Sequence, residues 1–329
     1  MGMFRALLVI FWIAYSLELF GLAFFAVPAT AQVQTDFDGD GVSDVTYTAV
    51  SGTSVLWKAT GSHSLTEEIN SSFGLLTDGL AIGHWFSSGS SNIGVIRPDS
   101  AKKNLVWKIL SDDSTITQVN FGKPGDLVLS GGDFDGDGIT DAAVVRIVKD
   151  KLVWSVERGI FSGSPARVRR FRLGGVGARA FFLNYDGTGD WLATFKKVSP
   201  KRARLVLRNI MTGRSKTING IPKSFAVGTR PRPFGVAQSD GRDYICFVTS
   251  DETDTTVTVF DTNGEKVVTR TYAGLGTVFT GDFLAEEAGE EIAFQTGTKI
   301  FFFNPSTNAV ATTTAVSGTP LDETNITQF

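Results

Sequence analysis

The chain has 329 residues and a formal net charge of −3, with 36 glycines and 26 phenylalanines. Its only cysteine, Cys246, excludes an intramolecular disulfide, so an exported protein of this composition must be held by its core, by metal, or by both. Cys246 lies in the apolar run DYICFVTS, which is typical of a buried, inert thiol.

The first 31 residues predict an export signal and not a folded element. Arg5 precedes a long apolar stretch that ends at Pro28 and the small-residue triplet Ala29-Thr30-Ala31. This order is typical of a secretory signal peptide, and we expect cleavage after Ala31. An uncleaved anchor is the alternative, although Glu18 in the middle of the stretch disfavours a stable span. No later apolar run is long enough to span a bilayer. From the signal peptide we expect a secreted or cell-envelope protein, and we expect it to be bacterial.

Residues 32–329 repeat with a period of about 49 residues. Each unit begins with a turn, continues with a short apolar run and reaches a second strand-like stretch 11 to 17 residues later, such as VLWK at 55–58. A weaker third stretch, a glycine-containing segment and a fourth apolar stretch complete the unit. The pieces are short and rich in Val, Ile, Phe, Trp and Thr, which favours strands over helices. The polar residues before the first run are 48, 49, 49, 53 and 48 residues apart: Asp44, Asn92, Asp141, Asp190, Asp243 and Glu291.

Four short strands in each unit predict the blade of a β-propeller. One such sheet cannot bury both faces alone, whereas blades around an axis bury each face against a neighbour and leave only short edges open. We therefore predict an all-β propeller of six four-stranded blades, with units beginning near residues 36, 83, 131, 181, 235 and 281. Seven blades, one of them degenerate, is the alternative. A parallel β-helix is disfavoured because its repeats are shorter.

Two units begin with nearly the same acidic phrase, DFDGDGVSD at 36–44 and DFDGDGITD at 133–141. Aspartates at alternate positions can turn their oxygens towards one centre, and Gly41 and Gly138 permit a sharp bend after the third aspartate. Such an all-oxygen set suits calcium better than magnesium, and two sites are predicted. The expected ligands are Asp36, Asp38, Asp40, the carbonyl of Val42 and Asp44 in one site, and Asp133, Asp135, Asp137, the carbonyl of Ile139 and Asp141 in the other.

The remaining turns limit this prediction to two sites. The turn at 84–92 has no acid, the turn at 239–243 carries Arg242, and the turn at 282–291 has a different spacing. The turn at 184–190 keeps two aspartates and is a weak third candidate. An EF-hand is excluded because Tyr47 and Val144 stand where its loop needs a bidentate acid. For the acidic turns that are predicted to bind calcium, the alternative is a solvated turn that binds no ion.

The pattern FG-x-x-GD…GDFDGDG-x-x-D-x-A-V-x-R, from Phe121 to Arg146, resembles the FG-GAP repeat, a VCBS-type repeat. This repeat occurs in the propeller of integrin alpha subunits and in many secreted bacterial proteins. The resemblance is strong in the units starting at Asp36 and Asp133 and weak in those at 83 and 235. It implies that the acidic segment joins the first two strands of a blade and binds calcium. It also implies a binding or adhesion module.

Charge is unevenly divided along the chain. Residues 151–223 hold sixteen Lys or Arg and three acids, a net charge of +13, while the remainder carries −16. Basic residues at alternate positions of a strand share a face. This sector predicts either a solvated edge or a docking surface for an acidic glycan, another anionic polymer or an acidic protein, with nucleic acid not expected. The candidate ligand-binding residues are Arg167, Arg169, Arg170, Arg202 and Arg204.

No catalytic or cofactor-binding constellation is present in the sequence. His63 and His84 lie in expected turns, and no G-x-S-x-G motif occurs. We therefore expect a calcium-stabilised binding or adhesion module and not an enzyme. The alternatives are a carbohydrate-active enzyme with its site in the axial channel, and a purely structural propeller.

Overall fold

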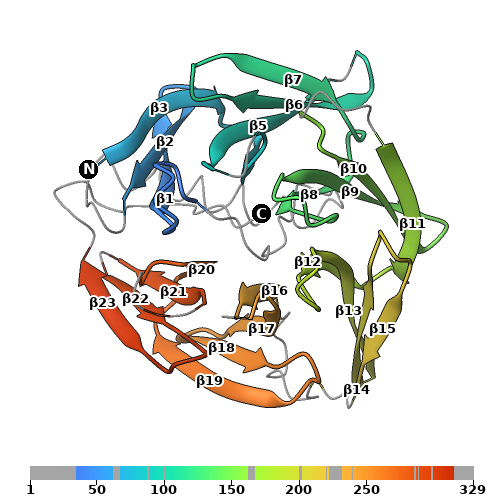
Figure 1. The fold of residues 1–329 in the computed structure, drawn as a ribbon, viewed down its shortest axis with the longest axis vertical. Coiled ribbons are helices and arrows are strands. Elements are labelled where there is room, and N and C mark those ends of the chain that lie inside the picture. The colour runs from blue at the N-terminus through green and yellow to red at the C-terminus, as the bar shows by residue number, and fades with distance from the viewer. Residues whose placement is uncertain are drawn as a thin grey trace, which may run out of the picture.

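The protein is a ring of six antiparallel sheets (Figure 1). The computed structural model describes residues 35–61, 67–86, 89–99, 101–161, 167–199, 202–219, 221, 232–238, 240–284, 287, 289–297 and 299–314. The predicted signal peptide, residues 1–31, lies outside the described residues. Within the described ranges there is no helix that could cross a membrane.

The first sheet contains three strands in the described part of the chain: β1 (Val45–Ser51), β2 (Ser54–Thr60) and β3 (Glu67–Leu75). The second contains β4 (Gly79–Gly83), β5 (Asn92–Asp99), β6 (Asn104–Leu110) and β7 (Ile116–Asn120). The third contains β8 (Leu127–Gly132), β9 (Asp141–Val148), β10 (Lys151–Arg158) and β11 (Arg167–Gly175).

The fourth sheet contains β12 (Arg179–Leu183), β13 (Trp191–Ser199), β14 (Arg202–Arg208) and β15 (Ser215–Ile218). The fifth contains β16 (Arg232–Ala237), β17 (Asp243–Ser250), β18 (Asp254–Phe260) and β19 (Lys266–Ala273). The sixth contains β20 (Thr277–Gly281), β21 (Glu291–Thr296), β22 (Lys299–Phe303) and β23 (Val310–Thr314). The predicted six-bladed propeller is confirmed. Each acidic or degenerate turn leads directly into β1, β5, β9, β13, β17 or β21, and in the five four-stranded sheets this is the second strand.

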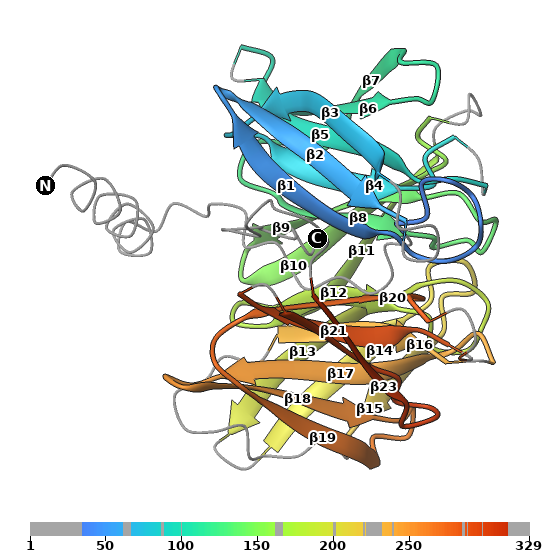
Figure 2. The same ribbon diagram turned by 90° about the vertical axis from the view of Figure 1, so that its left-hand side faces the viewer.

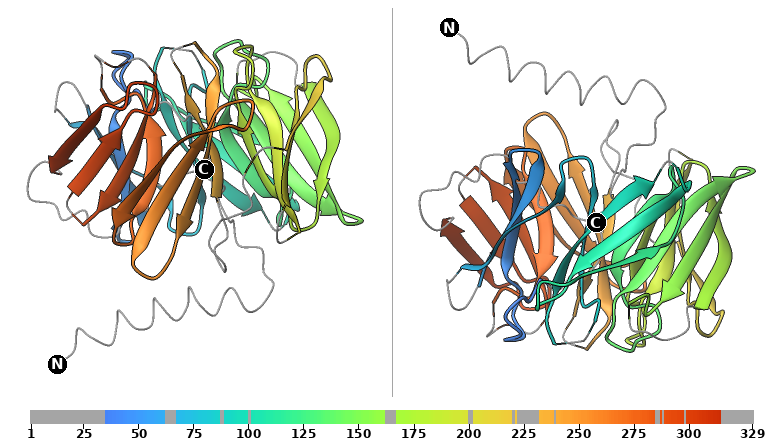
Figure 3. Two further views of the ribbon diagram at one scale, coloured as in Figure 1. Left: turned by 90° about the horizontal axis from the view of Figure 1, so that it is seen from below. Right: turned by 90° about the horizontal axis from the view of Figure 1, so that it is seen from above.

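Within each four-stranded sheet the strands follow one another in sequence order from the axis to the rim, and the first and last sheets lie side by side (Figures 1 and 2). Viewed from the edge, the strands run between the two faces of a short disc (Figure 3). The burial of the strands decreases from the axis towards the rim. In the second sheet, β5 is buried over its first five residues, β6 alternates between buried and half-buried positions, and β7 alternates between exposed and half-buried ones. The apolar runs of the sequence are therefore the strands covered on both faces by neighbouring blades.

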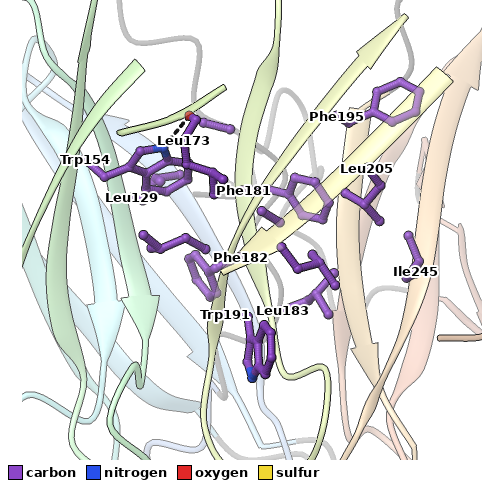
Figure 4. Packing of buried hydrophobic residues seen from close by; sticks show 14 of the residues in the cluster. Leu129, Trp154, Leu173, Phe181, Phe182, Leu183, Trp191, Phe195, Leu205 and Ile245 are labelled. Atoms are coloured by element: carbon purple, nitrogen blue, oxygen red, sulfur yellow. Dashed lines mark hydrogen bonds between the residues drawn. The ribbon is translucent and has the colours of Figure 1, made fainter. Parts of the chain in front are cut away.

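The largest core cluster joins the third, fourth and fifth blades (Figure 4). Trp154 of β10 and Phe182 of β12 are fully buried in it, and Phe195 of β13 packs against Phe247 of β17 with ring centroids 4.8 Å apart. Large aromatic side chains thus fill the wedge between adjacent sheets, which explains the high phenylalanine content.

Two further contacts explain the FG-x-x-GD motif. The indoles of the LVWK-type strands donate to the carbonyl of the residue that precedes the motif's glycine: Trp107 Nε1 lies 2.9 Å from Phe121 O. The aspartate of the motif pairs with the arginine at the end of the second strand. Asp126, with its side chain 1% exposed, accepts from Arg146 Nε and Nη2 at 2.6 Å, and Asp78 and Arg97 form the same pair at 2.7 Å. The motif therefore ties the turn between two consecutive blades to the later of the two.

A closed circle of six backbone hydrogen bonds joins the blades at the face that carries the acidic turns. In each bond the donor is a backbone N–H within two residues of the start of β1, β5, β9, β13, β17 or β21. The acceptor is the carbonyl at the start of the turn in the preceding blade, at 2.6–2.9 Å. The circle closes from the first blade onto the last. The donor–acceptor pairs are Ser91–Asp36, Thr140–His84, Asp190–Asp133, Asp243–Asn184, Glu290–Ala237 and Ser43–Asp282.

Four of these donor residues, Ser43, Asp190, Asp243 and Glu290, also accept a hydrogen bond in return, which makes their junctions two-bond clasps. Asp282 N donates to Ser43 Oγ, and Asn184 N donates to Asp243 Oδ2 at 2.7 Å. We call the residue that donates its backbone N–H at each junction the clasp residue. It is Ser or Thr in three blades and Asp or Glu in the other three. Burial raises the pKa of Asp190 and of Glu290 to about 8, and raises that of Asp243 well above its usual range. The remaining oxygen of each of these three acids has no partner among the described residues.

Asp243→Ser is expected to remove a pH-dependent loss of stability. A serine hydroxyl can accept the same backbone hydrogen bond, as Ser43 does in the first blade. With the folded-state pKa of Asp243 raised, the parent loses stability as pH rises from the ordinary carboxyl range, about 4, towards the folded value, by up to about 1.4 kcal/mol per pH unit. The variant should therefore be more stable than the parent at pH 9 and lose that advantage at pH 5. Urea unfolding at both pH values measures this. Asp240→Ser, an exposed change three residues away, is the control, and parallel pH profiles for Asp243→Ser and the parent would show that Asp243 is not responsible.

Candidate metal centres

The two acidic turns have the same local geometry. In the first, Asp36 Oδ1 accepts from Gly39 N at 2.7 Å and Oδ2 accepts from Gly41 N at 2.8 Å. In the second, Asp133 accepts from Gly136 N and Gly138 N at the same two distances. One aspartate therefore curls the loop around its own carboxylate in both turns.

The predicted bend after the third aspartate is present. Gly41 has φ +86° and Gly138 has φ +82°, in the left-handed region that favours glycine. The next residue in each turn, Val42 or Ile139, donates its N–H to the third aspartate at 2.8 Å. The third aspartate of each turn thus accepts a hydrogen bond from the backbone of the bend.

Three acids converge in each turn, with carboxylate oxygens that lie within 4.8 Å of one another. They are Asp36, Asp38 and Asp40 in the first turn and Asp133, Asp135 and Asp141 in the second. Six of the eight predicted carboxylate ligands thus belong to these groups. Asp44 and Asp137 do not, and the roles of these two acids and of the Val42 and Ile139 carbonyls stay predictions.

The final aspartate of each turn holds the loop to the blade. Asp44 Oδ2 accepts from Phe37 N at 2.8 Å, and Asp141 Oδ2 accepts from Phe134 N at 2.9 Å. Burial, with added repulsion from the neighbouring aspartates, raises the pKa of Asp44 to about 7 and that of Asp141 to about 8. A bound cation would reverse this effect by stabilising the charged carboxylates.

The donor chemistry fits a hard divalent cation. Carboxylate oxygens on a flexible loop, with no nitrogen or sulfur donor, are what calcium takes in proteins. The converging acids would supply the charge, and the glycine bends would let the loop adjust to the ion. These residues would hold the ion, whose contribution is to neutralise the turn.

A positively charged side chain, that of Arg158, lies against the second acidic turn. Arg158, the last residue of β10, places Nη1 2.7 Å from Asp135 Oδ2, with the two side chains only 13% and 14% exposed. It is brought there because Gly159 N donates to Asp141 Oδ1 at 2.7 Å. Sheet register places Gly61 at the equivalent position of the first blade, since Val45 pairs with Thr60 as Ala142 pairs with Glu157. At this position the first blade therefore has no side chain to supply the counter-charge that Arg158 gives the second turn, and no sequence signal identified Arg158.

The weak third candidate, the turn at 184–190, has its acids engaged elsewhere. Asn184 Oδ1 accepts from Gly187 N at 2.8 Å, so the loop keeps the curl of the acidic turns. Asp186 Oδ1 accepts from Thr188 Oγ1 and from Trp191 Nε1, and Asp190 is a clasp acid. Within the described ranges, no third acid converges with them.

Two of the other turns show why their sequences depart from the pattern. Arg242 pairs with Asp240 within the fifth blade's turn, where the arginine would repel a cation. In the sixth, Glu291 takes the place of Asp44 and Asp141 and accepts from Phe283 N at 2.8 Å. Its other oxygen accepts from Asn304 Nδ2 at 2.8 Å, so this acid is committed to structure.

The predicted basic residues lie on β11, the outermost strand of the third blade, and on β14, the third strand of the fourth blade. Arg169 and Arg170 are on β11 and Arg204 is on β14, with Arg170 and Arg204 exposed. The side chains of Arg167 and Arg202 lie outside the described residues. Arg208, also on β14, was missed by the sequence prediction and lies over the ring of Phe171, 5.2 Å from its centroid.

No protein-family model matches the chain, and no curated protein has a significantly similar sequence. Solved structures that align with the chain include a protein from Lactobacillus plantarum, with a TM-score of 0.44, 11% identity and coverage of 81% of this chain and 92% of that one. A prolyl endopeptidase aligns with a TM-score of 0.43 and 14% identity over 90% of this chain and 45% of its own. An ACO/RPE65 chimera aligns with a TM-score of 0.41 and 9% identity over 78% and 68%. These alignments are too distant to carry an argument about activity or ligand.

Proposed function

We propose that this protein is an exported, calcium-stabilised propeller of the FG-GAP or VCBS type that acts as a binding or adhesion module. The observation that carries the proposal is the pair of acidic turns, which share their loop geometry and each bring three carboxylates together. Concentrating that much negative charge is unfavourable without a cation. Calcium bound only to the folded state would offset it and stabilise the ring.

Removal of calcium should lower the melting temperature. One site occupied at about 100 times its dissociation constant contributes about 2.7 kcal/mol, so two sites correspond to a shift of about 9 °C for a domain of this size. Differential scanning calorimetry with saturating calcium and with a chelator measures the shift. Asp36→Asn and Asp133→Asn should each remove part of it, whereas Asp186→Asn, in a turn without a converging group, should not. Superimposable melts with and without chelator would overturn the proposal.

A further inference from the structure

Five arginines lie on two strands that meet at the junction between the third and fourth blades. Strand β11 is the outermost strand of its sheet and contacts β13 and β14 of the next one (Figure 1). We define the basic seam as Arg169, Arg170 and Arg172 of β11 with Arg204 and Arg208 of β14.

Neutral groups hold part of the seam in place. Arg169 Nη1 donates to the carbonyl of Ile210, across the junction between the blades, at 2.7 Å. The guanidinium of Arg208 stacks on Phe171, which lies on the same side of β11 as Arg169. Arg170 and Arg172 share the opposite side of β11 and are exposed, as is Arg204. Arg169 and Arg208 are therefore held in place by neighbouring groups, whereas Arg170, Arg172 and Arg204 are exposed to solvent.

The seam has no internal counter-charge. Among the described residues, five ion pairs form, and none of them involves an arginine of the seam. The acid closest in register is Glu157, which pairs with Val168 across β10 and β11 and is buried. Burial raises the pKa of Glu157, so this group is a poor partner for an exposed guanidinium. Protection of the β11 edge would not account for Arg204 and Arg208, which lie on β14, an inner strand of the fourth sheet.

The chemistry of the seam favours an acidic polysaccharide among polyanions. Guanidinium groups bind carboxylates through paired hydrogen bonds, and same-side residues on a strand repeat at about 6.7 Å, so one extended chain can meet several of them. Single-stranded nucleic acid is bound on exposed aromatic platforms, and protein interfaces are anchored by aromatic side chains. No aromatic side chain is exposed in the described part of the chain.

We propose that the basic seam is a docking site for a carboxylate-bearing polysaccharide. The proposal rests on the proposed function as a binding module and names its partner class. The ligand would lie along β11. The Arg169 end of the seam lies close to the second acidic turn, because Arg169 Nη1 donates to Ile210 O while Arg158 Nη1, which pairs with Asp135, lies 3.3 Å from Met211 Sδ. Polysaccharide binding and calcium-dependent stability are therefore measured on the same variants, so that loss of one can be told from loss of the other.

Binding of polygalacturonate to the full calcium-loaded protein tests this, with neutral dextran and an oligothymidylate as comparison ligands. The double charge reversal Arg170→Glu with Arg204→Glu should weaken polygalacturonate binding by about tenfold or more, and raised salt should weaken binding by the parent. The control is Lys266→Glu with Lys299→Glu, which makes the same change in charge at exposed positions of the fifth and sixth blades and should keep binding within about twofold.

Equal loss in the two double variants would overturn the proposal, because net charge alone would then explain binding. Oligothymidylate bound as tightly as polygalacturonate, or no polysaccharide binding by the parent, would also overturn it. Melting temperature and its shift with chelator are measured on every variant. If the shift persists while binding is absent, the seam proposal fails and the calcium-stabilised propeller stands.

Discussion

Gly189→Ala is expected to lower the free energy of unfolding by about 3 kcal/mol or more and to weaken calcium binding at the second turn. Gly189 has φ +114°, where a side chain is strained by about 1–3 kcal/mol. An added Cβ would also lie 2.9 Å from Gly136 N and 3.1 Å from Asp133 O, both backbone atoms of the acidic turn in the preceding blade. Neither atom can move without disturbing the loop that surrounds the candidate ion. Urea unfolding and calcium titration measure the two effects.

Gly177→Ala separates strain from contact. This glycine also has positive φ, +79°, but no atom lies within 4 Å of the Cβ position. It should cost only about 1 kcal/mol and leave calcium binding unchanged. If the two variants lose equal stability, or if Gly189→Ala binds calcium as the parent does, the close packing of the third and fourth turns is not important to the site.

The repeat period and its turn sequences were sufficient to predict this fold. Apolar runs such as DAAVVRI at 141–147 are the second strands, buried on both faces, and they stand out from the alternating third strands. The two acidic phrases also predicted their own geometry, because glycines at 41 and 138 and aspartates at 36 and 133 act within a nine-residue loop. Local chemistry of this kind can be read from spacing alone.

Contacts between blades could not be predicted in the same way. The clasp position is Ser43 in the first blade, Asp243 in the fifth and Glu290 in the sixth, and its constant feature is a backbone N–H that carries no sequence signature. The contact of Arg158 with Asp135 could not be predicted for a similar reason. It follows Asp141 by 17 residues, and only the register of β9 with β10 places it beside Asp135.

Arg158→Gln is expected to have opposite effects on stability and on calcium affinity. Arg158 neutralises Asp135 in the second turn, at a position that Gly61 occupies in the first blade. In chelator, loss of this largely buried pair should destabilise the protein by roughly 3 kcal/mol. With calcium, the ion no longer competes with a guanidinium for the same carboxylate, so affinity at the second turn should rise by about tenfold, equivalent to about 1.4 kcal/mol. The variant should therefore show a larger calcium-induced rise in melting temperature than the parent.

Two design features isolate the second turn. Asp36→Asn in the background removes binding at the first turn, so that isothermal titration calorimetry reports one site. Arg146→Gln is the matched control, because it also breaks an arginine pair with a buried aspartate, Asp126, but lies away from both acidic turns. It should lower stability in chelator and leave calcium affinity unchanged. Weaker calcium binding in Arg158→Gln would mean that the arginine instead orients Asp135 for the ion, and the internal counter-charge would then assist the metal and not compete with it.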